Sequence, residues 1–351
     1  MDKNTKEKIA CEVIKTLHKR FLSFPSEARE NRNAPFHEAF LNAFSTKLND
    51  VNISDRNYLI TLSSWLHGLN TALGQSFFEN VSYHISDGEK RTFKNVTLPL
   101  KVITQNNEIM SYLKNGEKIP NVEEENKLID LFLRDNNKNN NKSVANFTAD
   151  LYVENDEEVS AFEIKSVRPN SGEMRGEKEK ILRGKSYLKK EYPNKKVNFF
   201  LAVPYDPTEN RETPTKYNKK RYMNYAVEFK KFIDKDELLL ASEYWDYISG
   251  EKNTMENILE IIRKIATPDF ENKYKFINDR KNLHVDQDKY VSLLTEWELN
   301  TELKIVANDK KIEEEALKNK KIAKFKNNRL FKKDGTYDKN RVLKFYENEL
   351  I

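Results

Sequence analysis

The chain has 351 residues, a formal net charge of +5 and one cysteine, Cys11. Charged residues make up 33% of the sequence and the mean hydropathy is −0.83, so the surface is very polar, yet 38% hydrophobic residues are enough to build a core. A single cysteine excludes an internal disulfide framework and a cysteine-based zinc site. No stretch approaches the ~20 apolar residues of a membrane-spanning helix, and no signal peptide is visible. We therefore expect a soluble, cytoplasmic protein.

The first ninety residues are predicted to be helical. Apolar residues recur every three or four positions over residues 3–22, and a second helix is expected after Pro35. The longest apolar stripe covers residues 58–86 and predicts one long helix. Gly68 and Gly74 weaken that helix in isolation, so it should pack closely on other elements.

The pattern changes to short strands from about residue 90. Two strands are predicted at residues 146–153 and 159–167, separated by the acidic turn "ENDEE", and together they form a plausible hairpin. A short helix over 126–134 and an Asn/Lys-rich loop over 135–142 precede them.

The second half of the chain begins with a basic helix over about 172–191. The nearly continuous apolar run 197–203 then predicts a strand that is buried on both faces. A Pro-, Thr- and Lys-rich loop follows at 205–222, and residues 223–351 are predicted to be mostly helical. The fold class is therefore α/β (α+β), a mixed core with helical additions at both ends.

The segment "FEIKSV" places Glu163 and Lys165 on one face of a strand, because residues i and i+2 share a face. Asp150 interrupts the apolar pattern of the preceding strand, so pairing of the two strands would bring Asp150 and Glu163 together. Two close carboxylates repel each other unless a cation lies between them. Their oxygen ligands suit Mg²⁺, and a neighbouring lysine can orient water or stabilise developing negative charge. This combination is typical of phosphodiester hydrolysis.

A solvent-facing hairpin would explain the same charged residues without any chemistry. Glu-x-Lys occurs five times in the chain, but only the copy at Glu163 lies in a strand-like context. Residues 165–196 contain eleven Lys/Arg against four Glu, a net charge of +7. A basic segment beside a metal site suits a polyanionic substrate, because neutralised phosphates supply most nucleic-acid affinity. The five histidines show no metal-ligand spacing.

These residues resemble the motif of the PD-(D/E)XK nuclease superfamily, with Asp150 as the first acid and Glu163 and Lys165 as the (D/E)-x-K. The proline that usually precedes the first acid is absent, and "TAD" stands in its place. The longer segments "LGQSFFENVS", "FEIKSVRPNSGEMRGEKEKILRGKSYL" and "FFLAVPYDPTEN" resemble type II restriction endonucleases of the TdeIII family. The resemblance covers roughly residues 60–250.

The resemblance implies a restriction-endonuclease-like fold, a mixed sheet of four or five strands flanked by helices. It also implies that a glutamate on the helix before the sheet assists the metal site; Glu79 matches that place, and Glu38 is a weaker competitor. An exposed, purely structural Glu79 is the alternative. The backbone carbonyl of Ile164 is expected as a further metal ligand beside Asp150 and Glu163.

The resemblance places several basic side chains near the DNA backbone. On the helix after the strand they are Arg175, Lys178, Lys180, Arg183 and Lys185, of which Arg175 and Lys178 are the preferred phosphate contacts. In the loop "KYNKKRY" they are Lys219 and Arg221. The alternatives are a solvated helix with Glu/Lys pairs and a disordered loop. The basic segment 305–333 either clamps DNA or stays solvated.

The sequence thus predicts a Mg²⁺-dependent type II restriction endonuclease that cuts double-stranded DNA at a short palindromic sequence and leaves 5′-phosphate ends. Symmetric cutting implies a homodimer, and host DNA needs a separate methyltransferase. The nuclease core is expected at 58–250, between a helical region at 1–57 and a basic helical region at 251–351. A structure-specific or repair nuclease and a non-catalytic DNA-binding protein are the alternative functions.

Overall fold

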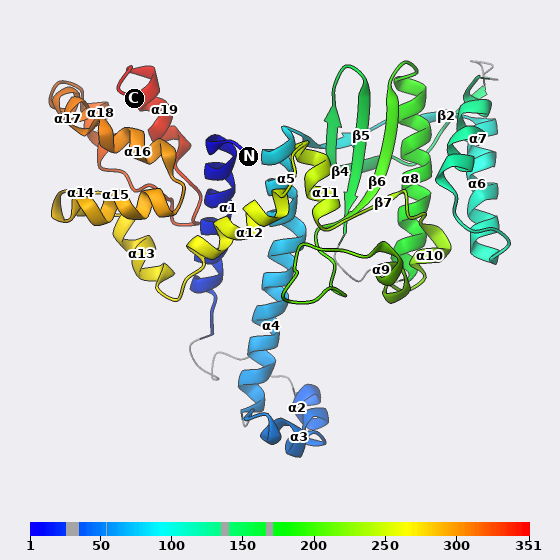
Figure 1. The fold of residues 1–351 in the computed structure, drawn as a ribbon, viewed down its shortest axis with the longest axis horizontal. Coiled ribbons are helices and arrows are strands. Elements are labelled where there is room, and N and C mark those ends of the chain that lie inside the picture. The colour runs from blue at the N-terminus through cyan, green and yellow to red at the C-terminus, as the bar shows by residue number, and fades with distance from the viewer. Residues whose placement is uncertain (26–34, 54, 135–139, 166–170) are drawn as a thin grey trace. The chain divides into compact units, whose positions relative to one another are not determined.

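The structure is a computed structural model that describes residues 1–25, 35–53, 55–134, 140–165 and 171–351 (Figure 1). The chain forms two compact units. The first contains Met1 and residues 78–259, and the second contains residues 2–77 and 260–351. The sheet-bearing unit therefore begins twenty residues later than the core expected at 58–250, because the helical residues before Phe78 pack within the second unit.

A five-stranded mixed sheet forms the centre of the first unit. Its strands follow the order β1-β4-β5-β6-β7, where β1 is Glu89–Phe93, β4 is Phe147–Glu154, β5 is Glu158–Ile164, β6 is Lys196–Val203 and β7 is Leu238–Leu240. The first three strands pair antiparallel, and the last three pair parallel. A separate two-stranded sheet joins β2 (Thr97–Pro99) to β3 (Asn141–Ser143). This arrangement confirms the expected mixed sheet.

The predicted hairpin is confirmed, with Leu151 of β4 opposite Phe162 of β5. Strand β6 is also confirmed, and Phe199 and Leu201 on it are buried. The short strand β7 and the helix α6 (Leu100–Asn115) were not expected from the sequence. Val102, Ile109 and Leu113 of α6 are buried, although the start of this segment reads as β-type locally.

Helix α8 (Ser171–Glu191) packs on β6, and α6 and α7 (Val122–Arg134) lie beside it (Figure 1). Gly184 allows the close approach of α8 to the sheet, because a methyl group at this position would overlap the ring of Phe199. Helix α5 (Phe78–Ser86) packs against β4 and α11 (Ser242–Ser249), where the hydroxyls of Ser82 and Tyr244 are 2.7 Å apart. The unit is completed by α9 (Lys219–Tyr225), α10 (Phe229–Phe232) and the first half of α12 (Thr254–Ile265).

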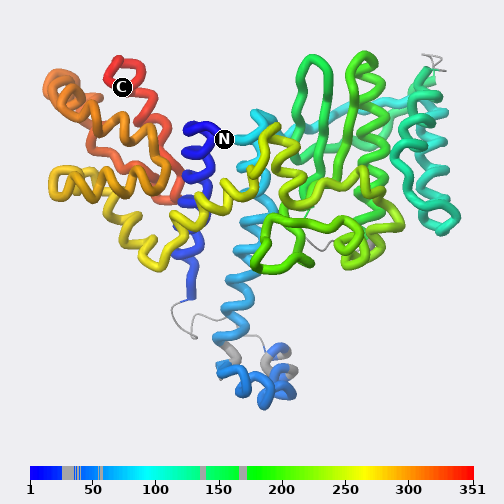
Figure 2. The backbone as a smooth tube through the Cα atoms, viewed as in Figure 1, coloured from blue at the N-terminus to red at the C-terminus, as the bar shows by residue number. Residues whose placement is uncertain are grey.

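The described residues of the second unit form helices joined by short connections, with one isolated β-bridge between Phe331 and Tyr337 (Figure 2). Its N-terminal part contains α1 (Lys3–Leu22), α2 (Pro35–Asn42), α3 (Ser45–Asp50) and α4 (Arg56–Ala72). A π-helical segment, Leu73–Phe77, joins α4 to α5 within the region expected to be one regular helix.

The C-terminal part of the second unit adds seven short helices and their own apolar core, which includes Ile305, Ile312 and Phe345. The helices are α13 (Phe270–Ile277), α14 (Asn282–Val285), α15 (Gln287–Glu296), α16 (Asn300–Ala307), α17 (Asp309–Lys318), α18 (Lys320–Lys326) and α19 (Lys339–Glu347). In the part of the chain that the structure describes, none of the helices has the length and apolarity needed to cross a membrane.

Candidate active site

The hairpin brings the two predicted metal-binding carboxylates together. Asp150 of β4 accepts a hydrogen bond through Oδ2 from the backbone N–H of Ile164, at 3.0 Å, and so lies beside Glu163 of β5. Glu163 is only 4% exposed. Burial, reinforced by the charge of Glu163, raises the pKa of Asp150 to about 6. A bound cation would relieve this unfavourable interaction.

Helix α5 adds Glu79 to the same place. Its Tyr83 hydroxyl donates to the backbone carbonyl of Asp150 at 2.7 Å, which fixes the helix against β4. Lys90 of β1 then links the two carboxylates, with its Nζ 3.0 Å from Glu79 and 3.7 Å from Asp150. Lys90 was not expected at the site, because nothing in its local sequence distinguishes it from a surface lysine.

Lys165 lies at the end of β5 and faces helix α8. Its Nζ is 2.9 Å from Glu163, 2.9 Å from Glu177 and 3.6 Å from Glu173. Lys180 of α8 pairs with the other carboxylate oxygen of Glu163. Burial opposes the charged form, but Glu163 and Glu177 raise the pKa of Lys165 above its ordinary value, so its ammonium group is held charged.

We name seven of these residues the catalytic cluster: Glu79, Lys90, Asp150, Glu163, Lys165, Glu177 and Lys180. Four of them are acids and three are lysines, and Lys90 and Lys165 are each shared between two of these carboxylates. Close carboxylate oxygens that outnumber their cationic partners suit one hard divalent cation. The residues present therefore fit a Mg²⁺ site.

Two predicted DNA contacts, Arg175 and Arg183 of α8, line a cavity of 490 Å³ with Asn107 and Lys114 of α6. Arg175 pairs with Glu179 at 3.0 Å. Burial lowers the pKa of Arg183, and its Nε has no hydrogen-bond partner within the described structure. Both side chains line this cavity, and their contact with a DNA phosphate stays a prediction.

The structure contradicts the predicted phosphate contact of Lys178. Its side chain has no exposed surface, and its Nζ lies 2.6 Å from Glu125 of α7 and 2.5 Å from Glu237. Lys185, also expected near DNA, is equally buried and lies 2.7 Å from Glu237. We name Glu125, Lys178, Lys185 and Glu237 the buried quartet. Both lysines are held inside the protein by carboxylates that are distant in sequence.

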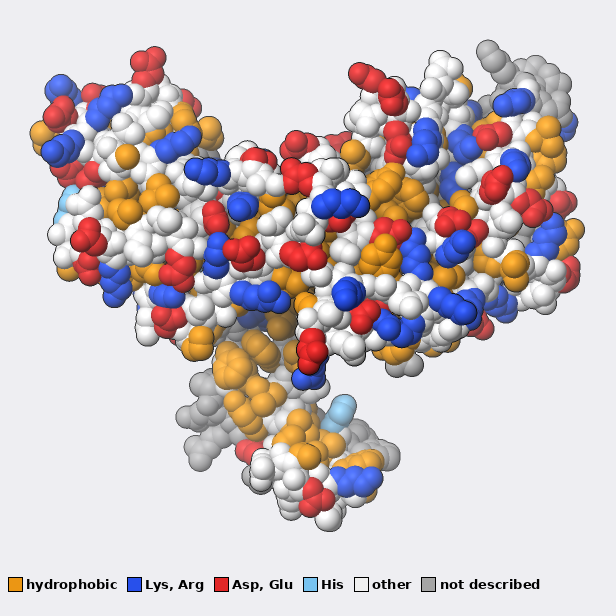
Figure 3. Space-filling view, in the orientation of Figure 1, with side chains coloured by type: hydrophobic (Ala, Val, Ile, Leu, Met, Phe, Trp, Pro, Cys, Tyr) orange, Lys and Arg blue, Asp and Glu red, His pale blue; other side chains and the backbone are white. Residues whose placement is uncertain are grey.

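The basic residues of the predicted loop also have acidic partners. Lys219 is 2.7 Å from Glu243, and Arg221, which is partly exposed, is 2.6 Å from Glu209. Figure 3 shows acidic and basic side chains interspersed on the face in view rather than gathered into one basic patch. The role of these residues in DNA binding stays a prediction. The side chain of Glu38, the competitor of Glu79, lies outside the described residues.

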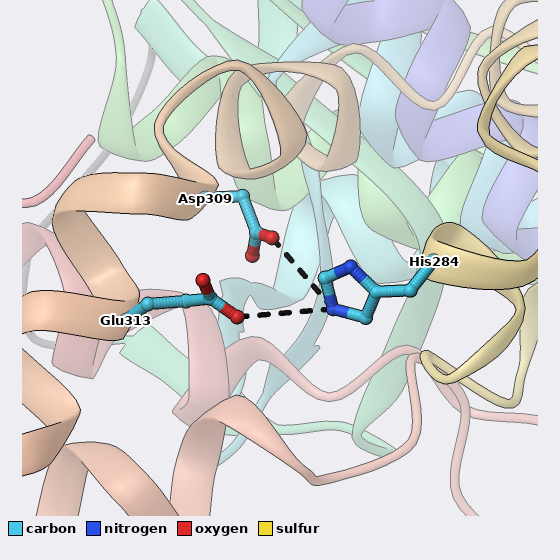
Figure 4. Close-up of side chains that lie close together, drawn as sticks. All are labelled: His284, Asp309 and Glu313. Carbon is cyan, nitrogen blue, oxygen red and sulfur yellow. Dashed lines mark ion pairs between the residues drawn. The ribbon is translucent and has the colours of Figure 1, made fainter.

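The second unit contains a group that sequence spacing did not reveal. His284 of α14 lies 3.9 Å from Asp309 and 3.8 Å from Glu313 of α17 (Figure 4). Both carboxylates already have cationic partners, because Arg280 pairs with Asp309 and Lys326 lies 2.7 Å from Glu313. We interpret this group as an ion-pair network between helices.

Comparison with known proteins gives a consistent result. Residues 1–266 match the family "Type II restriction endonuclease, HinfI". The chain is 43% identical to the type II restriction enzyme MjaII of Methanocaldococcus jannaschii in an alignment of 364 positions that covers 99% of this chain and 97% of that enzyme. It is also 31% identical to the type II restriction enzyme HgiCII of Herpetosiphon aurantiacus over 120 residues, or 34% of this chain and 40% of that enzyme. The finer likeness to TdeIII enzymes stays a prediction.

Proposed function

Because the chain belongs to the HinfI family of type II restriction endonucleases, we propose that it hydrolyses double-stranded DNA at a short palindromic sequence in a Mg²⁺-dependent reaction that leaves 5′-phosphate ends. The observation that supports the metal dependence is the catalytic cluster, where carboxylates outnumber lysines around Asp150 and Glu163. The raised pKa of Asp150 supports the same conclusion, because burial and Glu163 disfavour its charged form until a cation binds.

Asp150, Glu163 and the backbone carbonyl of Ile164 would hold the metal. Bound Mg²⁺ supplies Lewis-acid stabilisation of a phosphate oxygen and lowers the pKa of bound water. Lys165, held charged between two carboxylates, is placed to stabilise the negative charge that develops on the scissile phosphate and to orient the attacking water. Glu79, linked through Lys90 to Asp150, would assist by accepting a hydrogen bond from that water.

Contacts to the DNA backbone would come from Arg175 and Arg183, which border a cavity, and from Lys219 and Arg221. A palindromic site would be cut by a homodimer in which each subunit acts on one strand. A methyltransferase that modifies the same sequence would protect the host DNA.

Digestion of unmethylated phage DNA tests the proposal. The purified protein is incubated with Mg²⁺ or with EDTA, beside the Asp150→Ala variant. We expect discrete bands only with Mg²⁺ and no cleavage by the variant, with DNA binding retained. A smear would instead indicate a structure-specific or repair nuclease. Binding without cleavage under several divalent ions would indicate a non-catalytic DNA-binding protein, and cleavage by Asp150→Ala would contradict the site assignment.

A further inference from the structure

Glu177 of α8 has no part in the roles described so far, although it reaches the centre of the catalytic cluster. Its Oε1 is 2.9 Å from the Nζ of Lys165. Its side chain is 13% exposed, and its Oε2 is buried without a hydrogen-bond partner among the described residues. Burial of a carboxylate costs desolvation free energy unless the group is closely paired. The contact of Glu177 with Lys165 therefore has to offset much of this cost.

We infer that Glu177 is a positioning residue that holds the ammonium group of Lys165 in place during catalysis. The inference rests on the proposed function, because it assigns Glu177 a role only through Lys165. In the structure Lys165 is shared between Glu163 and Glu177 at equal distances of 2.9 Å. Once Glu163 shares its charge with a bound cation, it attracts Lys165 less strongly. Glu177 then remains as the close partner that keeps the lysine directed at the site.

The geometry distinguishes Glu177 from the other acid on the same helix face. Glu173 lies one turn earlier, 3.6 Å from the Nζ of Lys165, and its side chain is 35% exposed. Attraction between charges weakens with distance and with access of water. Glu173 therefore holds Lys165 weakly, although it differs from Glu177 by only one helical turn.

A fixed lysine matters because a transition state is stabilised only by groups that are already in place. A lysine side chain has several rotatable bonds, and an ammonium group that must be reoriented during the reaction loses part of its electrostatic effect. Glu177 receives no proton and touches no substrate in this role. Its removal should therefore lower the rate of the chemical step without weakening the binding of DNA.

The test compares Glu177→Gln, Glu177→Asp and Glu173→Gln with the wild type, using single-turnover cleavage of a cognate duplex in Mg²⁺. Affinity for the same duplex is measured in Ca²⁺, and all assays are run well below the lowest unfolding temperature. We expect Glu177→Gln to lower the cleavage rate ~10–100-fold, the range typical of residues that orient catalytic groups. Affinity should change less than ~3-fold, since no substrate contact is lost. Glu177→Asp should recover part of the rate because it keeps the charge.

Glu173→Gln is the matched control, and its rate should stay within ~3-fold of the wild type, as for a weak exposed pair. The inference would be overturned by a wild-type rate for Glu177→Gln, by equal losses in the two Gln variants, or by no recovery in Glu177→Asp. In all of these cases the wild type still cleaves and Asp150→Ala does not, so the proposed function stands. Absence of cleavage by the wild type would instead contradict the proposed function itself.

Discussion

The catalytic cluster and the buried quartet both include charged side chains of helix α8, yet they differ in charge balance and in burial. The quartet pairs two lysines with two glutamates in the interior, and the side chain of Lys178 has no contact with solvent. The catalytic cluster has four acids for three lysines and is more accessible, as Lys165 and Lys180 keep 17% and 19% of their side-chain surface. The charges of the quartet balance within the protein, whereas the acids of the catalytic cluster outnumber its lysines.

The comparison shows that residue type alone does not distinguish the buried ion-pair network from the proposed metal site, whereas charge balance and burial differ between them. Glu177 and Lys178 are neighbours in sequence, but successive residues of an α-helix point about 100° apart. Glu177 therefore faces Lys165, whereas Lys178 faces Glu125 and Glu237. Adjacent residues of one helix belong to two groups with different tasks.

The largest contrast in cleavage rate and melting temperature is expected when one glutamate is replaced by glutamine in each of the two groups. Glu163→Gln removes a proposed metal ligand and should lower single-turnover cleavage by ~10³-fold or more, since metal stabilisation of the transition state is worth several kcal/mol. Its melting temperature should stay near that of the wild type. Glu237→Gln should lower the melting temperature but cleave at nearly the wild-type rate at temperatures well below its unfolding transition. Similar rate losses in both variants would contradict the division into two groups.

Lys178→Met tests the stability of the buried quartet directly. Removal of one partner of a buried ion pair costs about 3–5 kcal/mol, because the remaining carboxylates stay buried with less compensation. Urea unfolding measures the change in the free energy of unfolding. Lys127→Met on α7, the helix that supplies Glu125, is the control; Lys127 is 73% exposed and 2.6 Å from Glu123, and its loss should cost less than about 1 kcal/mol. Equal effects would show that burial does not distinguish the two lysines.

The buried quartet should also make the free energy of unfolding depend on pH. Burial opposes ionisation, but Lys178 and Lys185 hold the pKa of Glu237 at about 2, below its ordinary value of 4.5. A lowered pKa in the folded state contributes stability above pH 4.5, and this stability is lost as the pH falls from 4.5 towards 2. The free energy of unfolding of the wild type should therefore fall more steeply over this window than that of Glu237→Gln. Parallel pH profiles would contradict the ionised state of Glu237.

The smallest effect is expected from Lys90→Met in the catalytic cluster. Lys90 is 51% exposed and competes with a cation for Glu79 and Asp150. Exposed ion pairs are worth about 0.2–1 kcal/mol, so its removal should lower the Mg²⁺ concentration for half-maximal cleavage by at most ~5-fold. A higher Mg²⁺ requirement would mean that Lys90 helps to bind the DNA phosphate rather than to compensate the negative charges of Glu79 and Asp150.

The hairpin and the pairing of Asp150 with Glu163 could be predicted because they depend on local patterns. Alternating apolar residues set the face of each strand, and the short acidic turn sets the antiparallel pairing. The apolar run of β6 likewise predicted a buried strand. Strand β7 could not be recognised, because three leucines within a helical region carry no strand period of their own.

The partners of the lysines could not be predicted for a different reason. Lys178 lies in a segment rich in Glu and Lys that reads as a solvated helix, and its partners Glu125 and Glu237 are 53 and 59 residues away. No local pattern encodes such a contact. The same holds for Lys90, whose position beside Asp150 depends on the pairing of β1 with β4.

Gly184 limits the substitutions that helix α8 can accept. The absence of a side chain there sets how deeply α8 lies against Phe147 and Phe199, and every lysine and glutamate that α8 contributes is positioned by that depth. A larger residue would lift the helix as a rigid body. The buried quartet and the catalytic cluster would then lose their alignment together. Gly184 is therefore among the positions of α8 least free to vary, whereas a methyl group at Gly176 would meet no atom within 4 Å.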